Sequence, residues 1–170
     1  MANKKIWLGM LLMALAFGIT FIGCDNGGSS GGNNSGGGSG NNDLNGTWVS
    51  GSGAGLSQLI LNNGNFEMSM GATPLARGTY TTSGNSITVT PKEANGEGVS
   101  KMFGYDLGLG SKWYSKAELK AFFENLGLWA LVGGTIDEYF APQTGTYSLS
   151  NNGNTLNLTL NGQSTTYTRK

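Results

Sequence analysis

The chain from residue 44 onward alternates apolar and polar residues with a period of two over much of its length. Phe66, Met68 and Met70 alternate with Glu67 and Ser69, and several later segments repeat the pattern. Strict alternation of this kind is typical of strands with one buried face and one face in water. The pattern predicts eight strands, at 45–50, 57–62, 65–71, 77–83, 86–91, 145–150, 155–160 and 163–169.

Short turn sequences separate these strands, as at Asn161-Gly162, where both residue types tolerate the positive φ of a tight hairpin. A Gly-Thr-aromatic triplet also recurs, at 46–48, 78–80 and 145–147. Consecutive hairpins form a meander, and a meander of about eight strands commonly closes because closure removes exposed edges. We therefore predict a mainly β fold, a small up-and-down antiparallel β-barrel over residues 44–170.

The alternation is interrupted between the fifth and sixth strands, over residues 92–144. Ser115 and Glu118 have the spacing of a capping box, and Gly127 is a plausible helix stop. A second capping signature follows at 135–138. The residues after the first signature form one apolar helical stripe: Leu119, Phe122, Phe123 and Leu126. We expect an insertion of one or two helices at this point.

The N-terminus has the layout of a secretory signal. Lys4 and Lys5 precede an 18-residue apolar run, Ile6–Gly23, and Cys24 follows it directly. A basic start, an apolar segment and a small residue before the cut are what signal cleavage requires. The alternative is an uncleaved membrane helix, because about 20 apolar residues span a bilayer.

The segment Phe21-Ile22-Gly23-Cys24 resembles the lipobox of bacterial lipoproteins, in a relaxed form seen in spirochaete-type proteins. The resemblance implies that residues 1–23 are removed and that Cys24 is lipidated. The thiolate of Cys is the side chain with the nucleophilicity for that transfer. The implied location is the cell envelope, as a membrane-anchored lipoprotein on a periplasmic face or an outer surface.

Residues 25–42 contain only Gly, Asn, Ser and one Asp. Such a segment buries too little apolar surface to offset its conformational entropy, so we expect a disordered tether over residues 24–43. A phosphate-binding loop is disfavoured because no Gly-Lys-Ser/Thr ending is present. The predicted organisation is a signal peptide at 1–23, a lipidated Cys and tether at 24–43, and one barrel domain at 44–170.

Gly46-Thr47-Trp48, at the start of the first strand, resembles the Gly-x-Trp signature of lipocalins and fatty-acid-binding proteins. The resemblance implies that Arg169, on the last strand, packs across the ring of Trp48 and closes the base of the barrel. It also implies a small apolar ligand inside the barrel. The inward-facing candidates to line such a cavity are Trp48, Phe66, Met68, Met70, Tyr80 and Tyr147.

The same side chains could instead fill the interior, because an eight-stranded barrel is just wide enough to be packed solid or to hold one small ligand. Two hypotheses therefore stand. The first is a lipid-anchored lipoprotein with a non-enzymatic lipocalin-like domain that binds a small apolar ligand. The alternative is a surface structural or protein-interaction lipoprotein with a solid barrel.

The composition argues against most enzymatic chemistry. The sequence has no His and a single Cys, which excludes Ser/His and Cys/His nucleophile pairs and most zinc sites. The acidic residues of the insertion are explained as helix caps and solvated faces, and nothing specifies the carboxylate pair of a glycosidase. We predict a non-enzyme with no catalytic residue, metal or cofactor.

The net charge of the chain limits the classes of partner that it can bind. Without residues 1–23 the chain would carry a net charge of about −2, and no basic patch is present, which argues against nucleic acid. The predicted partners are a membrane, through the lipid on Cys24, and a small hydrophobic ligand, with a protein partner left open.

Overall fold

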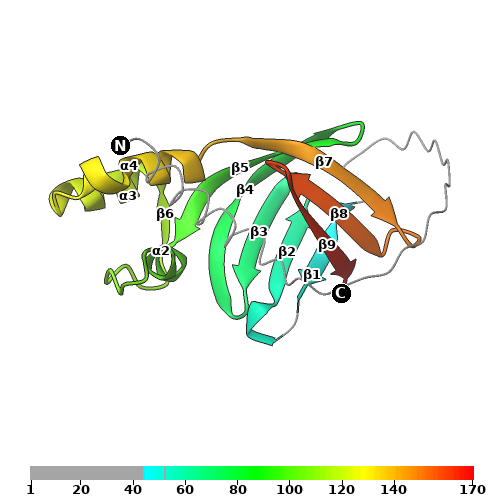
Figure 1. Ribbon diagram of the computed structural model, residues 1–170, viewed down its shortest axis with the longest axis horizontal. Helices are drawn as coiled ribbons and strands as arrows, with labels where there is room; N and C mark the ends of the chain where they lie inside the picture. Colours follow the sequence, from blue (N-terminus) through cyan, green and yellow to red (C-terminus); the bar gives the residue numbers. More distant parts are fainter. Residues whose placement is uncertain (1–43, 52) are drawn as a thin grey trace.

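The computed structural model describes residues 44–51 and 53–170 (Figure 1). The predicted signal peptide, Cys24 and the tether lie outside the described residues, so the expectations about them stay predictions.

Eight strands form a closed antiparallel barrel. Each pairs with its neighbours in the order β1-β2-β3-β4-β5-β7-β8-β9, and β9 pairs back with β1. The barrel strands are β1 (Gly46–Ser50), β2 (Ser57–Asn62), β3 (Asn65–Met70), β4 (Thr73–Ser83), β5 (Ser86–Asn95), β7 (Gln143–Ser150), β8 (Thr155–Leu160) and β9 (Gln163–Arg169). A short 3₁₀ turn, η2 (Gly53–Gly55), joins β1 to β2. The predicted up-and-down barrel is confirmed.

The strands β4 and β5 are longer than the sequence pattern predicted. Both continue past a bulge at which Gly78 faces Pro91 and the register shifts. Proline cannot donate a ladder hydrogen bond and is therefore typically found at bulges when it lies within a strand. Gly78 allows the close approach there, because a Cβ at this position would lie 2.2 Å from the carbonyl oxygen of Thr90.

Asparagines make the tight turns. Asn63, Asn151, Asn152 and Asn161 all have φ near +50°, a left-handed conformation that Asn tolerates better than most residues. The Asn-rich signals therefore marked the hairpins correctly.

The insertion differs from its prediction. It contains three helices and a short strand, not one or two helices: α2 (Gly96–Phe103), β6 (Trp113–Ser115), α3 (Lys116–Asn125) and α4 (Trp129–Tyr139). The strand β6 pairs with the far end of β5, beyond the barrel. The non-barrel segment also begins after Asn95, because β5 is longer than predicted.

Two details explain the difference. The start of α2 contains Gly96 and Gly98, and a Cβ on Gly96 would lie 2.4 Å from the carbonyl oxygen of Gly110. Glycine therefore lets this helix pack against backbone. The predicted helix start at 135–138 was wrong, because these residues lie inside α4, which follows Leu128 without a side-chain cap. The capping box of Ser115 and the stop at Gly127 are confirmed.

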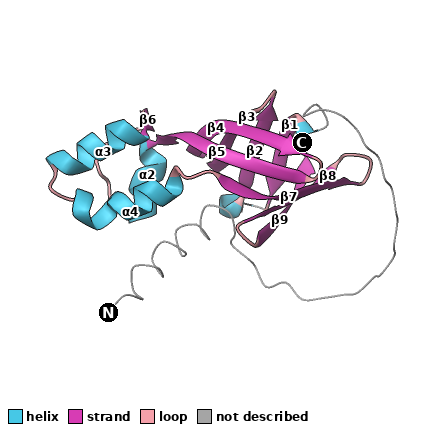
Figure 2. Cartoon of the chain, turned by 90° about the horizontal axis from the view of Figure 1, so that it is seen from above, coloured by secondary structure: helices cyan, strands magenta, loops and turns pink. Residues whose placement is uncertain are grey.

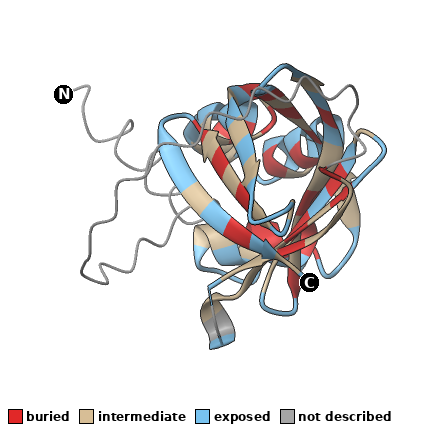
Figure 3. Ribbon diagram, turned by 90° about the vertical axis from the view of Figure 1, so that its right-hand side faces the viewer, coloured by how far each residue is buried: buried red, intermediate tan, exposed pale blue. Residues whose placement is uncertain are grey.

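The molecule has two hydrophobic cores. In Figure 2 the helices form a lobe at one end of the molecule, beside the barrel. One core fills the barrel, with buried residues from seven of its strands, and Figure 3 shows these buried stretches along the barrel wall. The other core lies between the helices, around Leu119, Phe123 and Ile136. Tyr139 packs against both cores.

Candidate functional site

Trp48 lies at the base of the barrel. Its side chain is fully buried, and its indole Nε1 donates a 2.8 Å hydrogen bond to the carbonyl oxygen of Leu44. The guanidinium of Arg169 lies 4.2 Å from the ring centroid, and the two residues face each other across β1 and β9. The structure therefore brings together the pair that the Gly-x-Trp resemblance had implied.

Arg169 also connects the residue before β1 and the turn between β7 and β8 to this base. Its side chain donates hydrogen bonds to the carbonyl oxygens of Asn45 (2.5 Å) and Gly153 (3.0 Å). Gly46 has φ +148°, and a Cβ on it would lie 2.6 Å from an Arg169 nitrogen. Glycine at this position makes room for the guanidinium. The arrangement closes the barrel and offers no reactive group.

The six candidate cavity residues divide into two groups. Trp48, Phe66, Met68 and Tyr80 lie in the barrel core, each at most 5% exposed. Met70 and Tyr147 are half-buried. A side chain that lines a water-sized cavity keeps accessible surface on the cavity side, so the first four are enclosed by other protein atoms.

The polar ends of the tyrosines are satisfied within the protein. The hydroxyl of Tyr80 donates to Oδ1 of Asn45 at 3.3 Å, and that of Tyr147 donates to the carbonyl oxygen of Gly84 at 3.1 Å. Burial raises the pKa values of Tyr80 and Tyr167 above the ordinary value of 10, partly offset by hydrogen bonds. Both phenols therefore stay neutral at physiological pH and do not act as bases.

Gln143 is the interior residue that the sequence pattern missed. It faces Val89 across β5 and β7, and Val89 belongs to the barrel core, so the two side chains share the inner face. Gln143 is 4% exposed, and its Oε1 has no hydrogen-bond donor among the described residues. Extending the alternation of the sixth predicted strand by two residues would have placed this amide inside the barrel.

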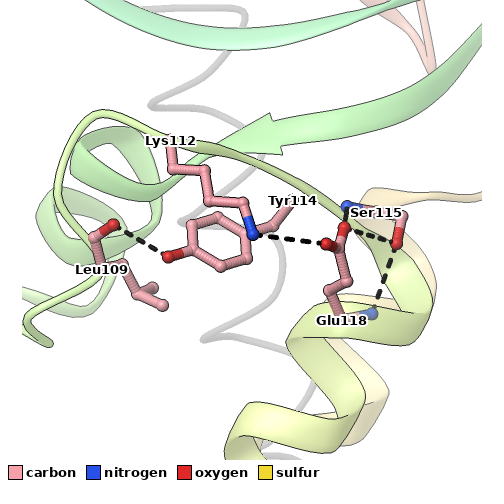
Figure 4. Close-up of polar contacts among 5 residues, drawn as sticks. All are labelled: Leu109, Lys112, Tyr114, Ser115 and Glu118. Carbon is pink, nitrogen blue, oxygen red and sulfur yellow. Dashed lines mark hydrogen bonds and ion pairs between the residues drawn. The ribbon is translucent and has the colours of Figure 1, made fainter.

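The carboxylates of the insertion have structural roles. The backbone N–H and hydroxyl of Ser115 donate to the Glu118 carboxylate at 2.8 and 2.9 Å, and the Glu118 N–H donates to Ser115 Oγ at 3.3 Å (Figure 4). These hydrogen bonds lower the pKa of Glu118. Asp137 pairs with Lys116 at 2.9 Å. Glu118 therefore acts as a helix cap, and Asp137 acts as an ion-pair partner.

The outer wall of the barrel carries a row of alternating charges. The register places Glu67, Arg77 and Glu93 side by side across β3, β4 and β5. The Nε of Arg77 lies 2.6 Å from Glu93, and its guanidinium lies 4.6 Å from the ring centroid of Trp113. The hydrogen bond that Arg77 donates to the Glu93 carboxylate raises the pKa of Arg77. A shallow groove of about 420 Å³ follows this row, with charges that largely compensate one another.

A second hollow, of about 630 Å³, lies between α2 and the loop that follows it. Glu97, Lys101 and Asp106 line it. Lys101 already donates to the hydroxyl of Thr73, and Asp106 accepts the N–H of Gly108 at 2.9 Å. In the described part of the chain, no three Asp, Glu, His or Cys side chains gather in a group that could hold a metal ion.

No protein-family model, curated protein or solved structure matches this chain. Of the helices in residues 44–51 and 53–170, none has the length and hydropathy to cross a bilayer.

Proposed function

We propose that this protein is a lipid-anchored lipoprotein of the bacterial cell envelope, whose lipocalin-like barrel is a non-enzymatic structural or protein-interaction module with a solid interior. The observation that carries the proposal is the near-complete burial of Trp48, Met68 and Tyr80 among other core side chains. Interiors packed to this degree leave few voids larger than a water molecule.

The anchor rests on the sequence from Phe21 to Cys24, which has the layout of a lipobox. Metabolic labelling with radioactive palmitate tests it directly. We expect label on the wild-type protein and none on Cys24→Ser, which should also leave the membrane fraction. Label that persists on the Cys24→Ser protein would contradict the anchor.

The solid interior is tested by native mass spectrometry of the mildly purified protein together with titration of a fluorescent fatty acid. We expect the bare protein mass and no saturable binding. Phe66→Ala titrated with benzene supplies a positive control, because deletion of a buried ring leaves a cavity that an apolar probe of that size can enter. Stoichiometric binding by the unmodified protein would favour a carrier.

A carrier of a small apolar ligand is the second candidate, and Gln143 is the observation that favours it. Its buried Oε1 has no donor among the described residues, and it faces the interior at the end of the barrel nearest the insertion. A ligand with an apolar body and one N–H or O–H group would complete this site, provided that the neighbouring side chains move apart to admit it, because Oε1 is enclosed in this structure. Binding that is saturable in the wild type and lost in Gln143→Leu would support the carrier over the solid barrel.

A further inference from the structure

The turn that joins α3 to α4 and the first turn of α4 expose large apolar side chains. Leu126 is 52% exposed and Leu131 is 76% exposed. Figure 2 shows this turn at the end of the helical lobe that is farthest from the barrel. We call the segment Leu126–Leu131 the apolar tip. Exposed apolar side chains grouped at a protruding end mark a contact surface more often than scattered ones do.

The apolar tip carries no net charge. Between residues 121 and 136 the one charged residue is Glu124, and it pairs with Lys120 at 3.7 Å. The start of α4 also lacks a polar cap, because Leu128 occupies the N-cap without a side-chain hydrogen bond. By contrast, α3 begins with the full capping box of Ser115. Residues 126–131 therefore contain no charged side chain and no side-chain cap.

The side chains around the apolar tip belong to residue types that suit the boundary between lipid and water. Trp129 is half-buried at the first position of α4, and the ammonium of Lys120 lies 5.8 Å from its ring centroid. Tryptophan is enriched at this boundary, where its ring is partly apolar and its N–H stays wet. Lysine can bury its aliphatic stem there while its charge remains in water.

The chain outside the described residues has the length to bring the tip to a membrane. Leu44 enters the domain at the base of the barrel, whereas the insertion follows the opposite end of β5. The strand β5 spans about 33 Å and α4 about 16 Å, so base and tip lie about 50 Å apart along these two elements. The 19 residues between Cys24 and Leu44 can extend over about 65 Å.

We propose that the apolar tip docks into the interface of the same bilayer that holds the lipid anchor, so that the domain touches the membrane at a second point. This inference rests on the proposed lipidation of Cys24, which makes a bilayer the apolar phase within reach. The occupant is a lipid surface, into which Leu126, Leu131 and the ring of Trp129 insert.

The test uses the full lipidated protein, reconstituted into phosphatidylcholine vesicles whose acyl chains carry bromine near the headgroup. Bromine quenches tryptophan emission at short range. We expect quenching in the wild type and in the matched control Trp113→Phe, and its loss in Trp129→Phe. The double variant Leu126→Ser/Leu131→Ser keeps Trp129 but should also lose the quenching. An unchanged circular dichroism spectrum shows that the variants remain folded.

The outcomes separate the two proposals. A protein that does not float with the vesicles lacks the anchor, and this result overturns the docking as well. A protein that floats but shows no quenching by brominated lipid retains the anchor and overturns the docking alone. An unquenched protein that forms dimers in detergent, and becomes monomeric in the double variant, would assign the tip to a second copy of the chain instead.

Discussion

The barrel and the helical insertion differ in how fully they bury their apolar side chains and pair their backbone groups. In the barrel every strand has a neighbour on both sides, and β9 returns to β1, so each strand edge is paired over at least part of its length. The insertion packs three helices around a smaller core and leaves Leu126 and Leu131 in solvent. A closed sheet pairs its own strand edges. A short helical lobe leaves apolar side chains exposed, and such side chains are available to contact another molecule.

Two features join these regions. The strands β4 and β5 run on beyond the barrel, where α2 packs against them. Tyr139, at the end of α4, packs against both cores, and its hydroxyl donates a 3.0 Å hydrogen bond to the carbonyl oxygen of Leu75 on β4. The pairing of β6 with the far end of β5 adds to this connection, and substitutions can show whether the two cores unfold together.

The largest expected effect comes from Trp48→Ala at the base of the barrel. It removes a fully buried ring and the surface on which Arg169 stacks, so we expect a loss of about 3–5 kcal/mol in the free energy of unfolding. Urea denaturation measures it. The matched control is Trp113→Ala on the half-buried ring against Arg77, with a cost of about 1 kcal/mol. Equal losses in the two variants would contradict the contrast between base and lobe.

Gln143→Leu should stabilise the protein. The substitution removes a buried amide oxygen that has no donor among the described residues and replaces it with an apolar group of similar size. An unsatisfied buried polar group costs about 1–3 kcal/mol, so a gain of that order is expected in thermal or urea unfolding. A loss of stability would show that a water or ligand satisfies Gln143 in solution.

Tyr139→Phe tests the connection between the two cores. It deletes the hydrogen bond to Leu75 but keeps the ring in place, so the free energy of unfolding should fall by about 1 kcal/mol. Hydrogen exchange should show the helices opening more readily while the barrel amides stay protected. Equal loss of protection in both regions would mean that they form one cooperative unit.

The smallest effect concerns pH. Hydrogen bonds from Ser115 hold the pKa of Glu118 below its ordinary value of 4.5, so the ionised carboxylate favours the folded helix α3. This contribution is present at neutral pH and is lost as the pH falls from about 4.5 through the lowered pKa of the folded state. Glu118→Gln should flatten the acid limb of helicity measured by circular dichroism. An unchanged acid limb would contradict the role of the carboxylate.

The barrel could be predicted because its signals are local. Alternating residues such as Leu156 and Leu158, bounded by Asn-Gly turns, specify both the strands and their register. The stacking of Arg169 on Trp48 required the additional resemblance to a known signature. The side-chain arrangement at the base then followed from the register that pairs the two residues.

The insertion was harder to predict because its determinants are tertiary. Gly96 is helical where a neighbouring backbone leaves no space for a side chain, and Leu128 starts α4 without any polar signal. The burial of Phe66 and Met68 was predicted, but whether they line a cavity depends on how closely the opposite strands approach. Alternation alone contains no information about that distance.

The pairing of β1 with β9 also has a consequence for the order of folding. Arg169 and Asn45, which meet at the base, are 124 positions apart in the chain. Neighbouring hairpins need only local contacts, whereas this closure must wait until the last strand has been synthesised. Contacts of such long sequence separation form slowly. Until that moment β1 offers an unpaired edge, and a chain truncated before Gln163 would keep that edge permanently open to other strands.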